Sequence, residues 1–262
     1  MPLFIYLSPH FDDAALSCGG LLRANAERGE RAVVVTVCAG TPDYGNLSKF
    51  AKVLHRQWGR PVDPIATRRA EDAEAARRLG VATHYLDIPD CIYRRDTRGR
   101  PVVFSNRSLF GPVHPDEQPL VQRIAQELLA GVRRRSDTRI LAPLAAGRHV
   151  DHQLVRDAAR LLSGLGYNVA WYEDFPYAGV RGAVTRARSA FDGSAWECAV
   201  FPIDVERKID AIRAYQSQLK STFRSERDMA ARVRAYNRAV AGGMGYAERI
   251  WHLKDRGTTQ HA

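Results

Sequence analysis

The chain has 262 residues, and 39 lysine and arginine side chains against 29 aspartate and glutamate side chains give it a formal net charge of +10. Its hydrophobic fraction of 45% and charged fraction of 26% are typical of a globular protein and argue against a disordered or fibrous chain. This length suits one α/β domain with additions. We expect a single domain over residues 1–262, with a core over about residues 1–180 and a C-terminal extension over about residues 181–262.

Neither a membrane nor an oxidising compartment is indicated. No stretch approaches the roughly 18 apolar residues of a membrane-spanning helix, and the first ten residues lack the basic segment and long apolar run of a signal peptide. Cys18, Cys38, Cys91 and Cys198 are far apart and form no CxxC pair, which argues against a disulfide framework or a structural zinc site. We therefore expect a cytoplasmic protein without a membrane partner.

Strands and helices alternate along the first two thirds of the chain. Apolar runs rich in β-branched residues predict strands at residues 3–7, 32–37, 83–88, 138–144 and 168–174. Helical spacing of apolar residues predicts helices between them at residues 14–28, 63–79, 117–134 and 150–162. This order favours a Rossmann-like, three-layer α/β sandwich with a mainly parallel sheet, in which ligands bind beyond the carboxyl ends of the strands.

The remaining segments are loops and a C-terminal helical embellishment. Residues 41–62 form a predicted loop, and residues 88–119 contain so many prolines and glycines that we expect a binding loop rather than a mere connection. After an extra strand at residues 197–203, two arginine-rich helices at residues 205–220 and 226–240 are predicted to pack against the sheet.

Two loops at the ends of predicted strands concentrate metal-ligand residue types. Residues 8–13, Ser-Pro-His-Phe-Asp-Asp, follow the first strand, and residues 149–152, His-Val-Asp-His, follow the fourth. A helix cap explains one such residue, but not this many in two loops. Catalytic zinc takes three protein ligands and leaves a position for water. One histidine from each loop and one aspartate would supply that set, and the spacing leaves open which of His149 and His152 is the ligand.

These two loops carry a resemblance to a known family. The segment SPHFDDAALSCGG resembles the [A/S]PHPDD signature of the PIG-L/LmbE-like zinc-dependent N-acetylglucosaminyl de-N-acetylases, and HVDH resembles their second motif, HxDH. The motifs are about 135 residues apart and each follows a predicted strand. Weaker resemblance runs through RRAEDAEAARRLG, LDIPD and YEDFPYA, so that it covers most of residues 1–180.

The resemblance implies a hydrolase that removes an acetyl or similar acyl group from the nitrogen of an amino sugar or glycoconjugate. It implies that His10, Asp13 and His152 bind Zn²⁺, with Fe²⁺ or another divalent ion as alternatives. Its partner would be a small N-acylated sugar or glycoconjugate, and association of the chain with itself is left open. A non-sugar, thiol-conjugate or natural-product amide is the alternative substrate.

The same resemblance assigns the residues that carry out catalysis. Asp12 would be the general base for the attacking water, because a carboxylate beside a dication stays ionised. His149 would stabilise the oxyanion or protonate the leaving amine, and Asp151 would orient a histidine. Asp90 and Arg68, or its neighbour Arg69, align with residues that contact substrate in the family.

Two departures from the family pattern bear on the site. Phe11 replaces the usual proline of the first motif, and we expect its ring to border the pocket. Some sugar deacetylases of the family place a carbonyl-polarising tyrosine two residues before HxDH, where this chain has Gly147. We expect that role to be vacant or filled by Arg148 or Tyr172.

The positive charge has two interpretations. A nucleic-acid footprint is the weaker one, because acidic residues are interleaved through the arginine-rich helices and no nucleic-acid module is present, so we expect no nucleic-acid partner. We hypothesise instead that arginines near Asp90 favour an acidic or phosphorylated sugar conjugate. They are Arg94, Arg95, Arg98 and Arg100.

A different class of enzyme is an alternative interpretation of the candidate metal site. Two histidines and a carboxylate also bind the metal of non-haem iron oxygenases, but those enzymes are usually built on β-rich folds rather than on alternating β and α.

Overall fold

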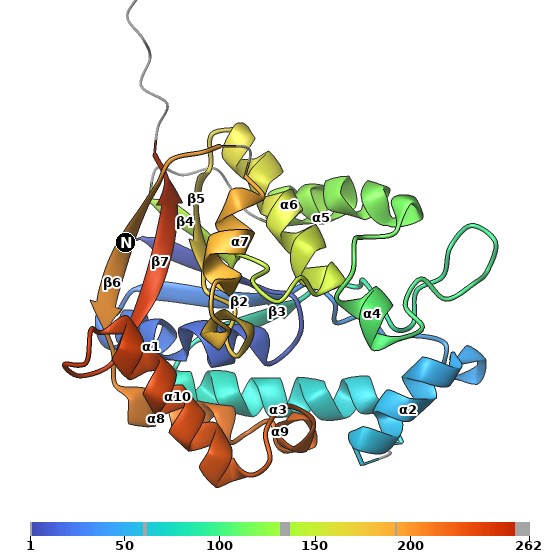
Figure 1. Cartoon of the computed structure of the whole chain (residues 1–262), viewed down its shortest axis with the longest axis horizontal. Coiled ribbons are helices and arrows are strands. Elements are labelled where there is room, and N and C mark those ends of the chain that lie inside the picture. Colours follow the sequence, from blue (N-terminus) through green and yellow to red (C-terminus); the bar gives the residue numbers. More distant parts are fainter. Residues whose placement is uncertain (1, 60–61, 132–136, 192, 255–262) are drawn as a thin grey trace, which may run out of the picture.

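The computed structural model describes residues 2–59, 62–131, 137–191 and 193–254. Within these ranges the strands are β1 (Leu3–Ser8), β2 (Arg31–Thr36), β3 (Ala82–Tyr85), β4 (Thr138–Pro143), β5 (Asn168–Tyr172), β6 (Trp196–Pro202) and β7 (Ala247–Leu253). They form one sheet in the order β3-β2-β1-β4-β5-β7-β6, with helices on both faces (Figure 1).

The first five strands are parallel, and the last two are antiparallel additions at one edge. Ile5 of β1 lies opposite Val33 of β2 and Ile140 of β4 in parallel register. Strand β7 pairs antiparallel with both β5 and β6. The prediction of a mainly parallel α/β sandwich is therefore confirmed. Strand β7 was not predicted, and it carries residues of the C-terminal extension into the sheet.

Helices cover both faces because the strands are apolar on both sides. One face carries α5 (Gln118–Gly131), α6 (Val150–Gly164) and α7 (Ala183–Ser189), and packs on side chains such as Ile5 and Leu7. The other face carries α1 (Asp13–Glu27), α3 (Pro64–Leu79) and α8 (Val205–Ile212), and packs on Tyr6 and Val34. The helices α9 (Gln216–Thr222) and α10 (Glu226–Val240) lie outside this second layer, beside α3 and α8 (Figure 1).

Two predicted loops and one predicted helix need correction. The predicted loop 41–62 contains α2 (Lys49–Gln57), and the loop 88–119 contains the short helix α4 (Asn106–Leu109). The single helix predicted at 205–220 is broken between α8 and α9. The predicted end of helix 117–134 lies outside the described residues, since α5 is described up to Gly131. No helix in the described part of the chain is both long and apolar enough to cross a membrane.

A buried ion pair joins the C-terminal extension to helix α1. The backbone leaves helical geometry at Cys18, with φ of −125°, so the amides after it lose their usual acceptors. The Glu248 carboxylate of β7 accepts the N–H groups of Gly20 at 3.0 Å and Leu21 at 2.8 Å. Lys208 of α8 donates to the same carboxylate at 2.7 Å, and both side chains are almost fully buried. The extension thus caps the second half of α1.

Lys208→Met is expected to destabilise the protein by about 3–5 kcal/mol, because it leaves the Glu248 carboxylate buried without its counter-charge. The free energy of unfolding from chemical denaturation measures this loss. Lys220→Met, on the exposed surface of α9, is the matched control and is expected to stay within about 0.5 kcal/mol of the unmodified protein. A loss no larger than that of the control would contradict this account of the ion pair.

Candidate active site

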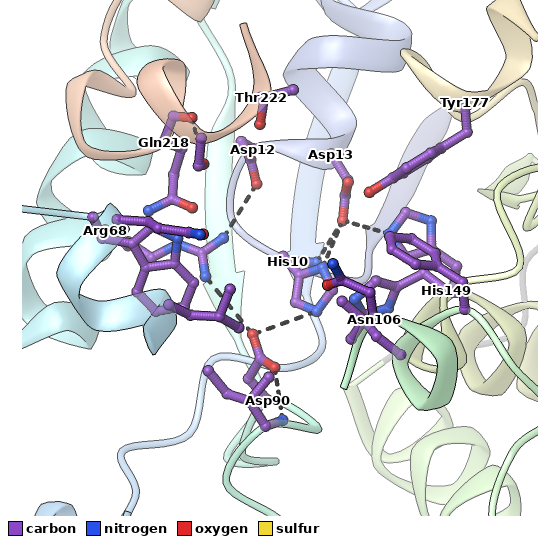
Figure 2. Close-up of a pocket in the computed structure, with 18 of the residues that line it drawn as sticks. His10, Asp12, Asp13, Arg68, Asp90, Asn106, His149, Tyr177, Gln218 and Thr222 are labelled. Atoms are coloured by element: carbon purple, nitrogen blue, oxygen red, sulfur yellow. Dashed lines mark hydrogen bonds and ion pairs between the residues drawn. The ribbon is translucent and has the colours of Figure 1, made fainter. Parts of the chain in front are cut away.

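A pocket of about 480 Å³ opens where the carboxyl ends of the parallel strands meet, as the fold predicts (Figure 2). The loop after β1, the loop after β4 and the loop after β5 supply its polar floor. Helices α2, α4 and α9 supply its walls. The lining residues from the two sequence motifs are His10, Asp12, Asp13, His149 and His152, and the lining also includes Arg68 and Asp90.

Three ligand atoms converge on one side of this pocket. His10 Nδ1 lies 3.1 Å from Asp13 Oδ2, and His152 Nε2 lies 3.2 Å from the same oxygen. The edges of a tetrahedron around zinc are roughly 3.3–3.5 Å, given zinc-to-ligand distances of about 2.0–2.2 Å. These residues therefore fit a zinc ion in both donor type and spacing. A ring nitrogen of His149 also lies within 4.8 Å of those of His10 and His152.

Each of these two imidazoles is also hydrogen-bonded to a second carboxylate, through its other ring nitrogen. His10 Nε2 lies 2.9 Å from Asp151 Oδ2, and His152 Nδ1 lies 2.6 Å from Asp174 Oδ1. Such a pair fixes the tautomer and the orientation of the ring and raises the basicity of the nitrogen that faces the metal. Asp151 was expected to orient a histidine, and the structure places it against His10. Asp174 was missed, although it is the last residue of a predicted strand.

Arg94 neutralises Asp151 from the side away from the pocket. Its guanidinium donates to Asp151 Oδ1 at 2.6 Å and also pairs with Glu117. Burial alone raises the pKa of Asp151, but the Arg94 charge holds that pKa well below its ordinary value. The hypothesis that Arg94 attracts an acidic substrate is therefore wrong. Arg95 donates to the Asn46 and Gly99 carbonyls.

Arg98 and Arg100 do not support that hypothesis either. The Arg100 side chain pairs with Asp96 at 2.7 Å, and the backbone N–H of Arg98 donates to the same aspartate. Neither arginine belongs to the described lining of the pocket. The side chains of Arg95 and Arg100 therefore bond within their own loop, and Arg98 is exposed.

The start of α1 leaves both aspartates of the first motif available for chemistry. Ser8 Oγ accepts the Ala14 N–H at 2.9 Å, so a serine supplies a hydrogen-bond acceptor at the start of the helix. Asp13 Oδ2 instead accepts the His10 N–H at 2.8 Å. Asp12 makes no capping bond and lines the pocket. The turn thus aims two neighbouring carboxylates at the same space.

Arg68 lies between two carboxylates of the pocket. Its guanidinium is 3.2 Å from Asp12 Oδ1 and 3.8 Å from Asp90 Oδ2. Phe11 and Trp58 pack their rings on it at 5.3 and 5.4 Å. Burial raises the pKa of Asp12, and the Arg68 charge opposes that rise. Phe11 itself is 1% exposed and belongs to the core, so the expectation that its ring borders the pocket is wrong.

His149 is presented to the pocket in one tautomer. Its Nδ1 accepts the backbone N–H of Asp151 at 3.2 Å, so the ring proton lies on Nε2. Burial, reinforced by the neighbouring His10 and His152, holds the pKa of His149 well below 6.5. His149 is therefore a neutral imidazole whose Nε2–H is available to a ligand.

Neither residue expected to replace the missing tyrosine lies in the pocket. The Tyr172 hydroxyl donates to the Leu7 carbonyl at 2.7 Å within the sheet, and Arg148 is exposed. Tyr177 lines the pocket instead, directly over Gly147. Tyr177 belongs to the segment YEDFPYA, which already resembled the family, but no pattern in that segment singled out this tyrosine.

The fold and the pocket define an α/β protein with a metal-ligating cluster at the carboxyl ends of its strands. The family model for PIG-L, GlcNAc-PI de-N-acetylase, matches residues 5–163. The chain therefore belongs to the PIG-L family, and the resemblance seen in its two motifs is confirmed.

Relatives and solved structures agree with this membership. The 2'-N-acetylparomamine deacetylase of Niallia circulans is 33% identical over 66% of this chain and 67% of its own length. That of Streptomyces fradiae is 31% identical over 94% of this chain and 88% of its own length. The zinc-inhibited form of teicoplanin deacetylase superposes with a TM-score of 0.82 at 27% identity, covering 97% of this chain and 99% of that one. The A40926 pseudoaglycone deacetylase gives 0.76 at 26% identity, covering 96% of both chains.

Asp174→Asn is expected to weaken Zn²⁺ binding by about 10- to 100-fold, because it removes the carboxylate that holds His152. Competition with a chromophoric chelator measures the dissociation constant. Asp157→Asn, on the same helix as His152 but paired with Arg156 at the surface, is the matched control. Equal affinities of the two variants would show that Asp174 does not support a metal ligand.

Proposed function

We propose that the protein is a zinc-dependent de-N-acetylase that hydrolyses the acetamide of an amino sugar or glycoconjugate. The observation that carries the proposal is the convergence of His10, Asp13 and His152 beside a further carboxylate, Asp12, in one pocket. Membership of the PIG-L family supports this function, as do the names of the relatives, which are deacetylases.

His10 Nδ1, Asp13 Oδ2 and His152 Nε2 would hold the metal ion. Zinc supplies a Lewis acid and a water of lowered pKa, and Fe²⁺ in the same set would supply the same two properties. The carboxylates behind the two imidazoles support this assignment, because second partners of this kind orient metal ligands. Among the described residues no carboxylate bonds to the ring of His149, and its Nδ1 is occupied by a backbone N–H. We therefore keep it out of the ligand set.

Asp12 accepts the proton of the attacking water in this proposal. Its carboxylate lines the pocket next to Asp13, and Arg68 holds it in place from the side. Asp12 then passes this proton to the amine as the C–N bond breaks. His149 donates a hydrogen bond from its Nε2–H to the carbonyl oxygen as that oxygen gains negative charge, because its tautomer places this proton on Nε2. Asp90 and Arg68 pair with each other. A contact with a substrate hydroxyl would therefore use the carboxylate oxygen or the guanidinium N–H groups that are not engaged in this pair.

The walls of the pocket favour a substrate with an apolar part next to its amino sugar. On α2 the lining positions recur at helical spacing, and Leu109 of α4 and the following Phe110 add two apolar side chains. These wall residues are Phe50, Val53, Leu54, Trp58, Leu109 and Phe110. We also propose that residues 1–262 act as one deacetylase domain in the cytoplasm. The four free thiols are in keeping with a reducing compartment.

Asp12→Asn and His152→Ala are expected to separate catalysis from metal binding. Asp12→Asn should lower kcat by about 10²–10⁴-fold and retain Zn²⁺, because it removes only the base. His152→Ala should lose metal and activity together. Metal analysis of the purified variants and an acetate-release assay measure the two properties. Full turnover by the Asp12 variant would show that another group is the base.

A screen of N-acetylated compounds is expected to give one acetate for each free amine, without oxygen uptake. The panel contains an N-acetylated aminoglycoside, an N-acetylglucosaminyl glycopeptide, free N-acetylglucosamine and a thiol-conjugate amide. We expect the sugars with a bulky aglycone to react faster than free N-acetylglucosamine, because only they reach the α2 wall. Substrate-dependent oxygen consumption without acetate would instead identify an oxygenase.

A further inference from the structure

Tyr177 brings a phenol to the metal-ligating cluster. Its ring lines the pocket and lies 6.0 Å from the ring of His152 and 5.7 Å from that of Phe110, measured between centroids. Figure 2 shows its hydroxyl directed toward the space beside Asp13. Within the described residues this hydroxyl makes no hydrogen bond. The phenol is therefore a donor that a bound molecule can use.

The absence of a side chain at Gly147 leaves room for the Tyr177 ring. A Cβ atom at residue 147 would lie 2.4 Å from Tyr177 Cγ and 2.6 Å from Cδ1, distances at which the ring has to move. The backbone around the tyrosine is tied to Asp174, whose carbonyl accepts the Ala178 N–H at 2.8 Å. The Asp174 carboxylate also accepts the Ala146 N–H at 3.1 Å. The residue that holds His152 thus also fixes the tyrosine relative to the cluster.

We propose that Tyr177 is a catalytic residue that donates a hydrogen bond to the substrate carbonyl oxygen as it gains negative charge. The proposal rests on the de-N-acetylase function above. When the water oxygen bonds to the carbonyl carbon, the electron pair of the C=O π bond moves to this oxygen. The pair returns when the C–N bond breaks and the amine leaves with the proton that Asp12 took from the water. Tyr177 keeps its own proton throughout, so its part is a preorganised hydrogen bond.

Tyr177→Phe tests the hydroxyl alone. Loss of one preorganised donor is expected to lower kcat by about 10²–10³-fold, with KM changed by less than about threefold and zinc content unchanged. Binding gives a second measurement. A methylphosphonamide analogue of the substrate, tetrahedral at phosphorus, should bind the variant more weakly, whereas the deacetylated product should bind both proteins equally. Tyr246→Phe, outside the pocket lining, is the matched control.

Gly147→Ala tests whether the ring position matters through the hydroxyl. It should lower kcat strongly in the unmodified protein and have little further effect in the Tyr177→Phe protein. Equal losses in both backgrounds, or unchanged kcat and unchanged phosphonamide binding in Tyr177→Phe, would overturn the role of Tyr177. Those results leave the deacetylase proposal intact. That proposal fails separately if the zinc-loaded unmodified protein releases no acetate from the panel.

Discussion

The active site depends on burying many charges together, which is stable only when each one has a partner. The buried carboxylates Asp13, Asp90, Asp151 and Asp174 lie among the buried imidazoles of His10, His149 and His152. A carboxylate buried alone costs several kcal/mol, and removing one partner of a buried pair is similarly costly. Arg94 and Arg68 supply two of these partners, since Arg94 pairs with Asp151 and Arg68 with the largely buried Asp12. The arginines near the pocket are therefore counter-charges of the site itself, and the net charge of the chain says little about its substrate.

Local patterns allowed most of the fold to be predicted from the sequence. Runs of β-branched residues predicted the parallel strands, and the two motifs that follow β1 and β4 predicted which side chains meet. The pattern did not reveal β7, because Glu248 interrupts its apolar run. Its burial depends on distant partners, namely Lys208 and the backbone N–H groups of Gly20 and Leu21. The break between α8 and α9 also lacks a proline or glycine to mark it.

Contacts between distant residues account for what the sequence did not reveal in the site. Asp174 and His152 are 22 residues apart, and Arg94 and Asp151 are 57 apart, so no spacing rule connects them. Arg94 stands in a loop rich in proline and glycine, where a charged side chain ordinarily faces water. Its burial is a consequence of tertiary packing against Glu117 and Asp151.

The C-terminal extension shapes the pocket although the family model ends before it. Gln218 and Thr222 lie four residues apart on one face of α9, and both line the pocket near Asp12 (Figure 2). Tyr215, at the break before α9, donates to Asp72 of α3 at 2.8 Å and so anchors that helix. The side chains proposed to bind metal and to transfer protons all come from residues 10–152, whereas part of the wall comes from beyond residue 163. A relative that matches only the first part of the chain therefore informs the chemistry more than the choice of substrate.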